Sequence, residues 1–114
     1  MDTRTKIHSY EDALDRIRGK NARWVRGRFD PMLRGHAHRL AELAKGTDLL
    51  IVTVLDSGPD SILPLEARAQ LVAALAAVDY VVIGNAPAHA ENIDDAQLRA
   101  KLAEHVRQRQ RESA

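Results

Sequence analysis

The fold is decided by the stretch ARWVRGRFDPMLRGHAHRLAEL, residues 22–43. Trp24 and Val25 lie in a short extended run, the chain turns between Gly27 and Gly35, and an amphipathic helix begins at His36. The N-terminus of a helix presents unpaired N–H groups and the positive end of the helix dipole, and a glycine lets a phosphate approach the backbone. The stretch therefore predicts a strand, a turn and a helix start that can bind phosphate.

Outward from this stretch, helices and strands alternate along the chain. Ser9 is placed to cap the first helix and Gly19 to end it. Residues 48–56 and 79–84 are apolar nearly throughout, as in parallel strands that are covered on both faces. The expected helices are 9–19, 36–45, 65–78 and 93–106, and the expected strands are 23–26, 48–56 and 79–84. The alternation predicts an α/β fold with a parallel sheet and right-handed crossovers, and residues 85–92 are expected to form a loop.

Length and composition indicate a single domain over residues 1–114, with frayed ends at 1–8 and 107–114. The chain has no cysteine, which excludes disulfides, thiolate zinc sites and a cysteine nucleophile. It contains neither an apolar run long enough for a membrane span nor a signal-peptide core. We therefore expect a cytoplasmic protein with no membrane partner.

The positive charge is concentrated in the first third of the chain, although the net charge is only +1. Most of these basic residues are expected on a solvated surface. Arg26, Arg28, Arg34 and Arg39 differ because they bracket the turn and the helix start. They favour an anion the size of a phosphate over a nucleic acid, since no nucleic-acid-binding motif accompanies them.

Residues 27–36, GRFDPMLRGH, resemble the G-x-F-D-x-x-H-x-G-H signature of the cytidylyltransferase-like nucleotidyltransferases. The stretch looks like that of the nucleotidyltransferase half of ADP-heptose synthase and of glycerol-3-phosphate cytidylyltransferase. Residues 50–54 are similar to that family's second strand, and residues 63–82 to its Pro-Leu-x-x-Arg helix and the strand after it. The resemblance covers roughly residues 7–84.

The resemblance implies a doubly wound, Rossmann-like fold with a nucleotide over the carboxyl ends of the strands. The implied reaction is attack by a substrate phosphate on the α-phosphorus of CTP or ATP, with pyrophosphate leaving and Mg²⁺ assisting. His36 matches the second signature histidine and is the expected catalytic residue. The expected nucleotide or phosphate ligands are Gly27, Arg28, Phe29, Asp30, Arg34, Gly35, His36 and Arg68. No metal-ligating residue is expected, and two simpler interpretations stay open: Asp30 holds the turn, or Arg68 forms a surface salt bridge with Glu66 or Asp60.

Three departures from the family pattern predict weak or absent catalysis. Leu33 stands where the first signature histidine belongs, and the loop at residues 56–63 has acids but no base. The family's Ile-Ser-Thr-Thr element and its last two strands have no counterpart, which predicts a minimal three-strand sheet. One donor that stabilises transition-state charge is typically worth about 10²–10³ in rate. Arg26, Arg28 or Arg34 could compensate in part.

Three functions remain open at this point. The chain could be a small nucleotidyltransferase, a catalytically inactive module for nucleotide sensing or protein assembly, or one subunit of a split enzyme. A three-strand sheet would leave its first strand at an open edge, which invites pairing. We therefore also predict a homodimer or a hetero-assembly through that edge.

Overall fold

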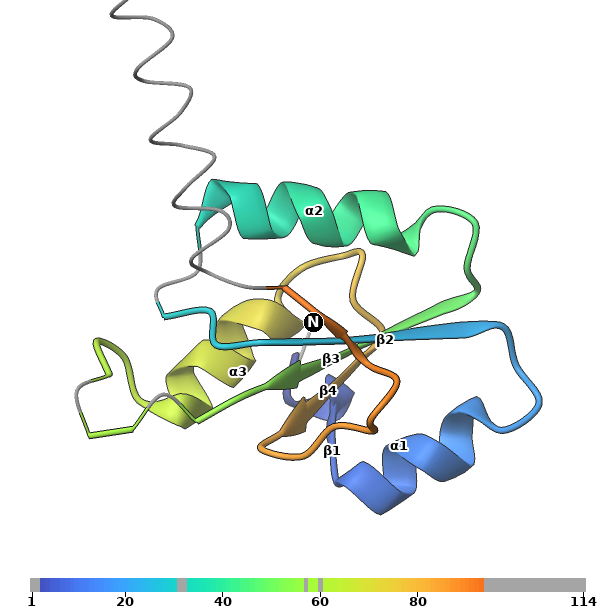
Figure 1. The fold of residues 1–114 in the computed structure, drawn as a ribbon, viewed down its shortest axis with the longest axis horizontal. Coiled ribbons are helices and arrows are strands. Elements are labelled where there is room, and N and C mark those ends of the chain that lie inside the picture. Colours follow the sequence, from blue (N-terminus) through green and yellow to red (C-terminus); the bar gives the residue numbers. More distant parts are fainter. Residues whose placement is uncertain (1–2, 31–32, 57, 60, 94–114) are drawn as a thin grey trace, which may run out of the picture.

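The computed structural model describes residues 3–30, 33–56, 58–59 and 61–93 (Figure 1). The elements in chain order are a 3-10 helix η1 (Thr3–Lys6), β1 (Ile7–His8), α1 (Tyr10–Ile17), β2 (Ala22–Gly27), α2 (Arg34–Ala44), β3 (Leu49–Val54), α3 (Leu65–Ala73), β4 (Tyr80–Ile83) and β5 (Glu91–Asn92). All strand pairs are parallel, and the order across the sheet is β1-β4-β3-β2-β5. This is a Rossmann-like α/β fold, as the sequence predicted.

Helices cover both faces of the sheet (Figure 1). On one face, α2 and α3 bury an apolar cluster that includes Val25, Leu40 and Val72. On the other face, α1 packs over a smaller cluster around Ala13 and Trp24. Successive residues of a strand point to opposite faces, so a strand covered on both sides must be apolar throughout. That requirement explains the unbroken apolar run of β3.

The three predicted strands and the first three predicted helices are confirmed, with small changes at their ends. Ser9 caps α1 by accepting a hydrogen bond from the Asp12 amide at 3.1 Å. Helix α3 ends at Ala73 rather than at residue 78. After Ala73 the chain turns toward β4 through short-range hydrogen bonds such as Leu75 N to Val72 O at 3.1 Å. This turn overrides the helix propensity of the alanine-rich segment.

The expectation of a three-strand sheet is wrong, because a short strand is added at each edge. Ile7 and His8 form β1, paired with Val81 and Val82 of β4, so the predicted fraying does not apply to residues 3–8. The expected loop at residues 85–92 contains β5 at its end. Two-residue strands are too short to show an alternating pattern, and hydrogen bonding to an existing edge is what orders them.

Strand β5 partly covers the edge of the sheet that was expected to be open. It pairs with Val25 and Arg26 of β2 and leaves the first half of β2 without a described neighbour on that side. An assembly through this edge stays a prediction. The last predicted helix, apart from Ile93, and the predicted frayed end at 107–114 lie outside the described residues.

The sheet changes its direction of winding between β2 and β5. From β2 the chain moves through β3 to β4 on one side, and β5 then returns to the opposite side of β2. In open parallel sheets the ligand site lies outside the carboxyl ends of the strands at such a switch point. The end of β2 is therefore the place where a ligand is expected on topology alone.

Candidate functional site

Strand β2 ends at Gly27, where the backbone is too crowded for a side chain. A Cβ built at this position would lie 2.9 Å from the carbonyl oxygen of Ile93 and 3.0 Å from the ring of Phe29. The Gly27 carbonyl accepts a hydrogen bond from the Leu55 amide at 2.8 Å, which ties the ends of β2 and β3 together. The glycine of the signature is thus required by packing.

The chain leaves β2 through a strained turn. Phe29 has a φ of 52°, in the left-handed region that bulky residues seldom occupy. Its side chain is fully buried in the cluster beneath α2 and α3, and burial of that ring holds the backbone in place. Arg28 is exposed, as is Arg34 at the start of α2.

Asp30 links this turn to the loop before α3. Its two carboxylate oxygens accept hydrogen bonds from the amides of Ile62 and Leu63, each at 2.9 Å. This is the loop-holding role that the sequence left open for Asp30. The contact brings two loops that are distant in sequence together at the carboxyl edge of the sheet.

The N-terminus of α2 opens onto the same edge. Leu33 is the N-cap residue and offers no side-chain acceptor. The ring of His36 takes over part of the capping, because the Leu33 N–H donates to its Nδ1 at 2.9 Å. The amides of Arg34 and Gly35 have no intrahelical partner, and within the described part of the chain no other partner exists for them.

His36 is fully buried and its ring packs edge-on against Phe29, with 5.3 Å between the ring centroids. Because Nδ1 accepts a hydrogen bond, the neutral ring carries its proton on Nε2. The local structure thus explains why a histidine follows Gly35, whatever its chemistry. The catalytic role of His36 stays a prediction.

Arg68 of α3 is buried beneath the turn, with 1% of its surface exposed. Its guanidinium donates to the carbonyl oxygens of Arg28 at 2.7 Å, Leu55 at 2.8 Å and Leu63 at 3.1 Å. The alternative of a surface salt bridge is therefore wrong. Arg68 instead joins the segments after β2, after β3 and before α3, and a direct contact with a nucleotide stays a prediction.

Arg26 immediately precedes this turn. The sequence named it among four arginines that favour a phosphate-sized anion, although not among the expected ligands. It is the residue before Gly27 in β2 and is half-buried, and its Nε is buried without a hydrogen-bond partner among the residues that the structure describes. The sequence did contain a signal, since a charged residue in an otherwise apolar strand end is unusual. The pattern of apolar and polar residues along β2 could not show that the Arg26 Nε would lack a hydrogen-bond partner.

The described residues offer no ready-made magnesium site. Among them there is no group of three or more His, Asp or Glu side chains that could hold a metal ion. Both oxygens of Asp30 already accept backbone hydrogen bonds. The described side chains therefore do not form a protein-held Mg²⁺ site, and we derive no step through the metal. A search of the same residues finds no helix that is long and apolar enough to cross a membrane.

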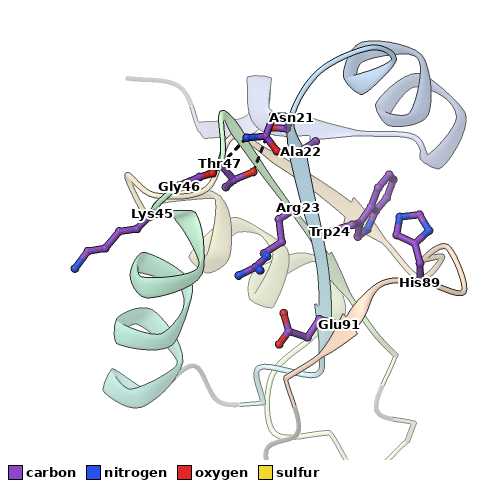
Figure 2. A pocket seen from close by; sticks show the side chains of 9 residues that line it. All are labelled: Asn21, Ala22, Arg23, Trp24, Lys45, Gly46, Thr47, His89 and Glu91. Carbon is purple, nitrogen blue, oxygen red and sulfur yellow. Dashed lines mark hydrogen bonds between the residues drawn. The ribbon is translucent and has the colours of Figure 1, made fainter.

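A surface hollow of about 440 Å³ lies elsewhere, along the first half of β2 (Figure 2). In Figure 2, Arg23 and Glu91 extend toward the α2 side of the strand, while Trp24 and His89 lie on the other side. Glu91 pairs with Arg39 of α2 at 3.6 Å. The hollow adjoins the amino end of β2, so it is separate from the turn at Gly27.

A parallel α/β sheet that carries a glycine turn and a helix start at its carboxyl edge is typical of Rossmann-like domains. The sequence profile of the cytidylyltransferase-like family matches residues 24–103, more than half of the chain. The chain belongs to the cytidylyltransferase-like family. A search of curated proteins gave no match.

Proposed function

We propose that this domain binds a nucleoside triphosphate, CTP or ATP, at the carboxyl edge of β2, with the phosphates at the N-terminus of α2. Membership of the cytidylyltransferase-like family supports a nucleotidyltransferase-like function. The observation that carries the location is the exposed start of α2 at Arg34 and Gly35, where two amides have no partner in the described part of the chain. Free amides and the helix dipole attract an anion.

Nucleotidyl transfer to a phosphorylated acceptor is the activity that the family suggests. In such chemistry the protein positions the phosphates and neutralises the charge that develops on them. The side chain of Leu33 cannot donate a hydrogen bond, and the Nδ1 of His36 is already used in capping. We therefore propose nucleotide binding with transfer that is slow or absent.

Isothermal titration calorimetry with CTP and with ATP, in the presence of Mg²⁺, tests the binding. The informative variant is His36→Asn, because the amide oxygen of asparagine can replace Nδ1 as the acceptor for the Leu33 N–H while Nε2 is lost. We expect the wild-type protein to bind one of the two nucleotides, and His36→Asn to bind it at least tenfold more weakly at a temperature where thermal unfolding shows that both proteins are folded.

A second assay separates binding from transfer. The protein is incubated with the nucleotide that binds, Mg²⁺ and a sugar phosphate or glycerol 3-phosphate, and pyrophosphate release is measured. Binding without pyrophosphate is the expected result for a nucleotide-sensing module. Failure of the wild-type protein to bind either nucleotide would overturn the proposed function.

A further inference from the structure

The guanidinium of Arg26 is an unusual feature of the carboxyl edge. Its Nε is buried and has no hydrogen-bond partner among the described residues. Arg26 also takes part in no ion pair in the described part of the chain. An N–H group of a charged side chain that loses water without gaining a partner destabilises the folded protein. A bound ligand that supplies the missing acceptor would remove this cost.

The position of Arg26 in the sheet coincides with the switch point. Arg26 is aligned with Asn92 of β5 on one side and with Thr53 of β3 on the other. The boundary between β2 and β5 is where the winding of the sheet reverses. Topology and the unpaired guanidinium are independent observations, and both point to a ligand at the end of β2.

Neighbouring groups leave the guanidinium available. Thr53 lies in the same row, but its hydroxyl accepts from the Trp24 indole N–H and donates to the Asn85 carbonyl, both at 2.8 Å. Arg26 is half-buried as a residue while its Nε is fully buried, so its exposed area lies on other atoms of the residue. A ligand over the carboxyl end of β2 would approach it from there.

We propose that Arg26 binds a phosphate group of the ligand at the switch point between β2 and β5. The guanidinium is a planar fork of N–H donors that matches the oxygens of a phosphate. Because strand residues alternate between faces, Arg26 lies on the α1 side of β2 with Trp24, so it would meet a phosphate over the strand end from the side opposite α2. The identification of the anion as phosphate rests on the proposed function, whereas the unpaired guanidinium does not.

Calorimetry with two probes, the nucleotide with Mg²⁺ and inorganic triphosphate, tests the proposal. The variants are Arg26→Met, which keeps the apolar stem and removes the fork, and Arg26→Lys, which keeps the charge alone. We expect Arg26→Met to bind both probes about tenfold or more weakly, as the loss of a charge-assisted hydrogen bond predicts. Arg26→Lys should fall between Arg26→Met and the wild type.

Arg23→Met is the matched control, because it removes the same charge from the amino end of the same strand. We expect its affinity for both probes to remain within about twofold of the wild type, since an exposed distant charge contributes little. A loss in Arg23→Met that exceeds the loss in Arg26→Met would move the anion to the hollow along the first half of β2 and overturn the proposal.

The melting temperature without ligand separates ligand binding from a purely structural role of Arg26. A structural role predicts a lower melting temperature for Arg26→Met, and an unpaired ligand-binding group does not. Removing an unpaired buried N–H should leave the melting temperature of Arg26→Met equal to or above that of the wild type. A clear decrease would mean that Arg26 stabilises the fold, and would overturn the proposal.

The two probes separate the failure of this inference from the failure of the proposed function. Binding of inorganic triphosphate that depends on Arg26, without binding of CTP or ATP, would support the anion site and reject the nucleotide. Nucleotide binding that is equal in the wild type and Arg26→Met would reject the role of Arg26 alone. A wild-type protein that binds neither probe would reject both.

Discussion

Replacement of Arg68 by methionine should strongly destabilise the protein, because this one side chain joins three segments at the candidate site. Its guanidinium satisfies the carbonyl oxygens of Arg28, Leu55 and Leu63 at 2.7, 2.8 and 3.1 Å. Methionine fills much of the same volume but donates nothing. All three carbonyls, whose hydrogen bonds to Arg68 are partly buried, would then lose a charged donor.

The magnitude follows from what such interactions are worth. A hydrogen bond to a charged group contributes about 1.5–3 kcal/mol, and desolvation of the buried arginine offsets part of the sum. Removing one partner of a buried charged set typically costs about 3–5 kcal/mol. At about 4 °C per kcal/mol for a domain of this size, the melting temperature should fall by about 12–20 °C.

Thermal unfolding followed by far-ultraviolet circular dichroism measures this shift. The control is Arg18→Met, since the Arg18 side chain is 81% exposed and its ion pair with Asp15 lies in solvent. That change should cost less than about 0.5 kcal/mol. If Arg68→Met melts within about 4 °C of the wild type while nucleotide affinity is lost, Arg68 acts chiefly as a ligand and the structural reasoning is refuted.

Three further predictions concern other parts of the fold. Gly27→Ala should destabilise by about 1–3 kcal/mol in urea unfolding, because its Cβ would meet the backbone carbonyl just beyond β5 at 2.9 Å; an unchanged midpoint would show that the strand ends move freely. Thr53→Val should cost about 1–3 kcal/mol by the same assay, since the buried indole N–H of Trp24 loses its acceptor, and a neutral result would contradict that hydrogen bond. The hydrogen bond from Arg16, with smaller contributions from charge and His8, lowers the pKa of Asp12 below 3.8. Because the folded pKa is depressed, its stabilisation is present above the unfolded pKa and is lost as the pH falls through the folded pKa. Asp12→Asn should therefore flatten the fall of the urea midpoint between about pH 5 and about pH 2, and an unaltered acid slope would refute this.

The centre of the sheet could be predicted from the sequence because a strand that is buried on both faces is a continuous run of apolar residues. Residues 49–54 are apolar nearly throughout, and Gly46 and Pro64 mark where the flanking helices end and begin. Each of these signals depends on neighbours within a few positions, so no knowledge of the tertiary structure was needed.

The two edge strands could not be predicted, because their order comes from distant partners. Ile7 pairs with Val81, and Glu91 with Val25. A two-residue strand carries no periodicity, and its hydrogen bonds exist only once the neighbouring strand is in place. The strand β5 was missing from the expected three-strand sheet. Its position beside β2 converts the expected open edge into a switch point.

The candidate site shows the same division between local and distant signals. The signature is contiguous in the sequence, so it predicted that Gly27, Asp30 and His36 lie together between the end of β2 and the start of α2, where the structure has them. Their part in a functional site stays a prediction. The sequence did not indicate that Asp30 would accept the amides of Ile62 and Leu63, or that His36 would cap the helix start at Leu33. Both residues are held by contacts that a packed turn requires even without a ligand.

The structural roles of the motif residues bear on whether the motif still has a chemical function. Gly27, Asp30 and His36 each have a structural reason to be present, so their presence alone does not argue for catalysis. Arg26 has no such reason, because its buried Nε bonds to nothing in the described part of the chain and its desolvation works against folding. A residue that costs stability and sits at the switch point is a stronger indicator of ligand binding than the motif residues that build the turn. Function at this edge is therefore better judged from Arg26 than from the histidine that the family signature emphasises.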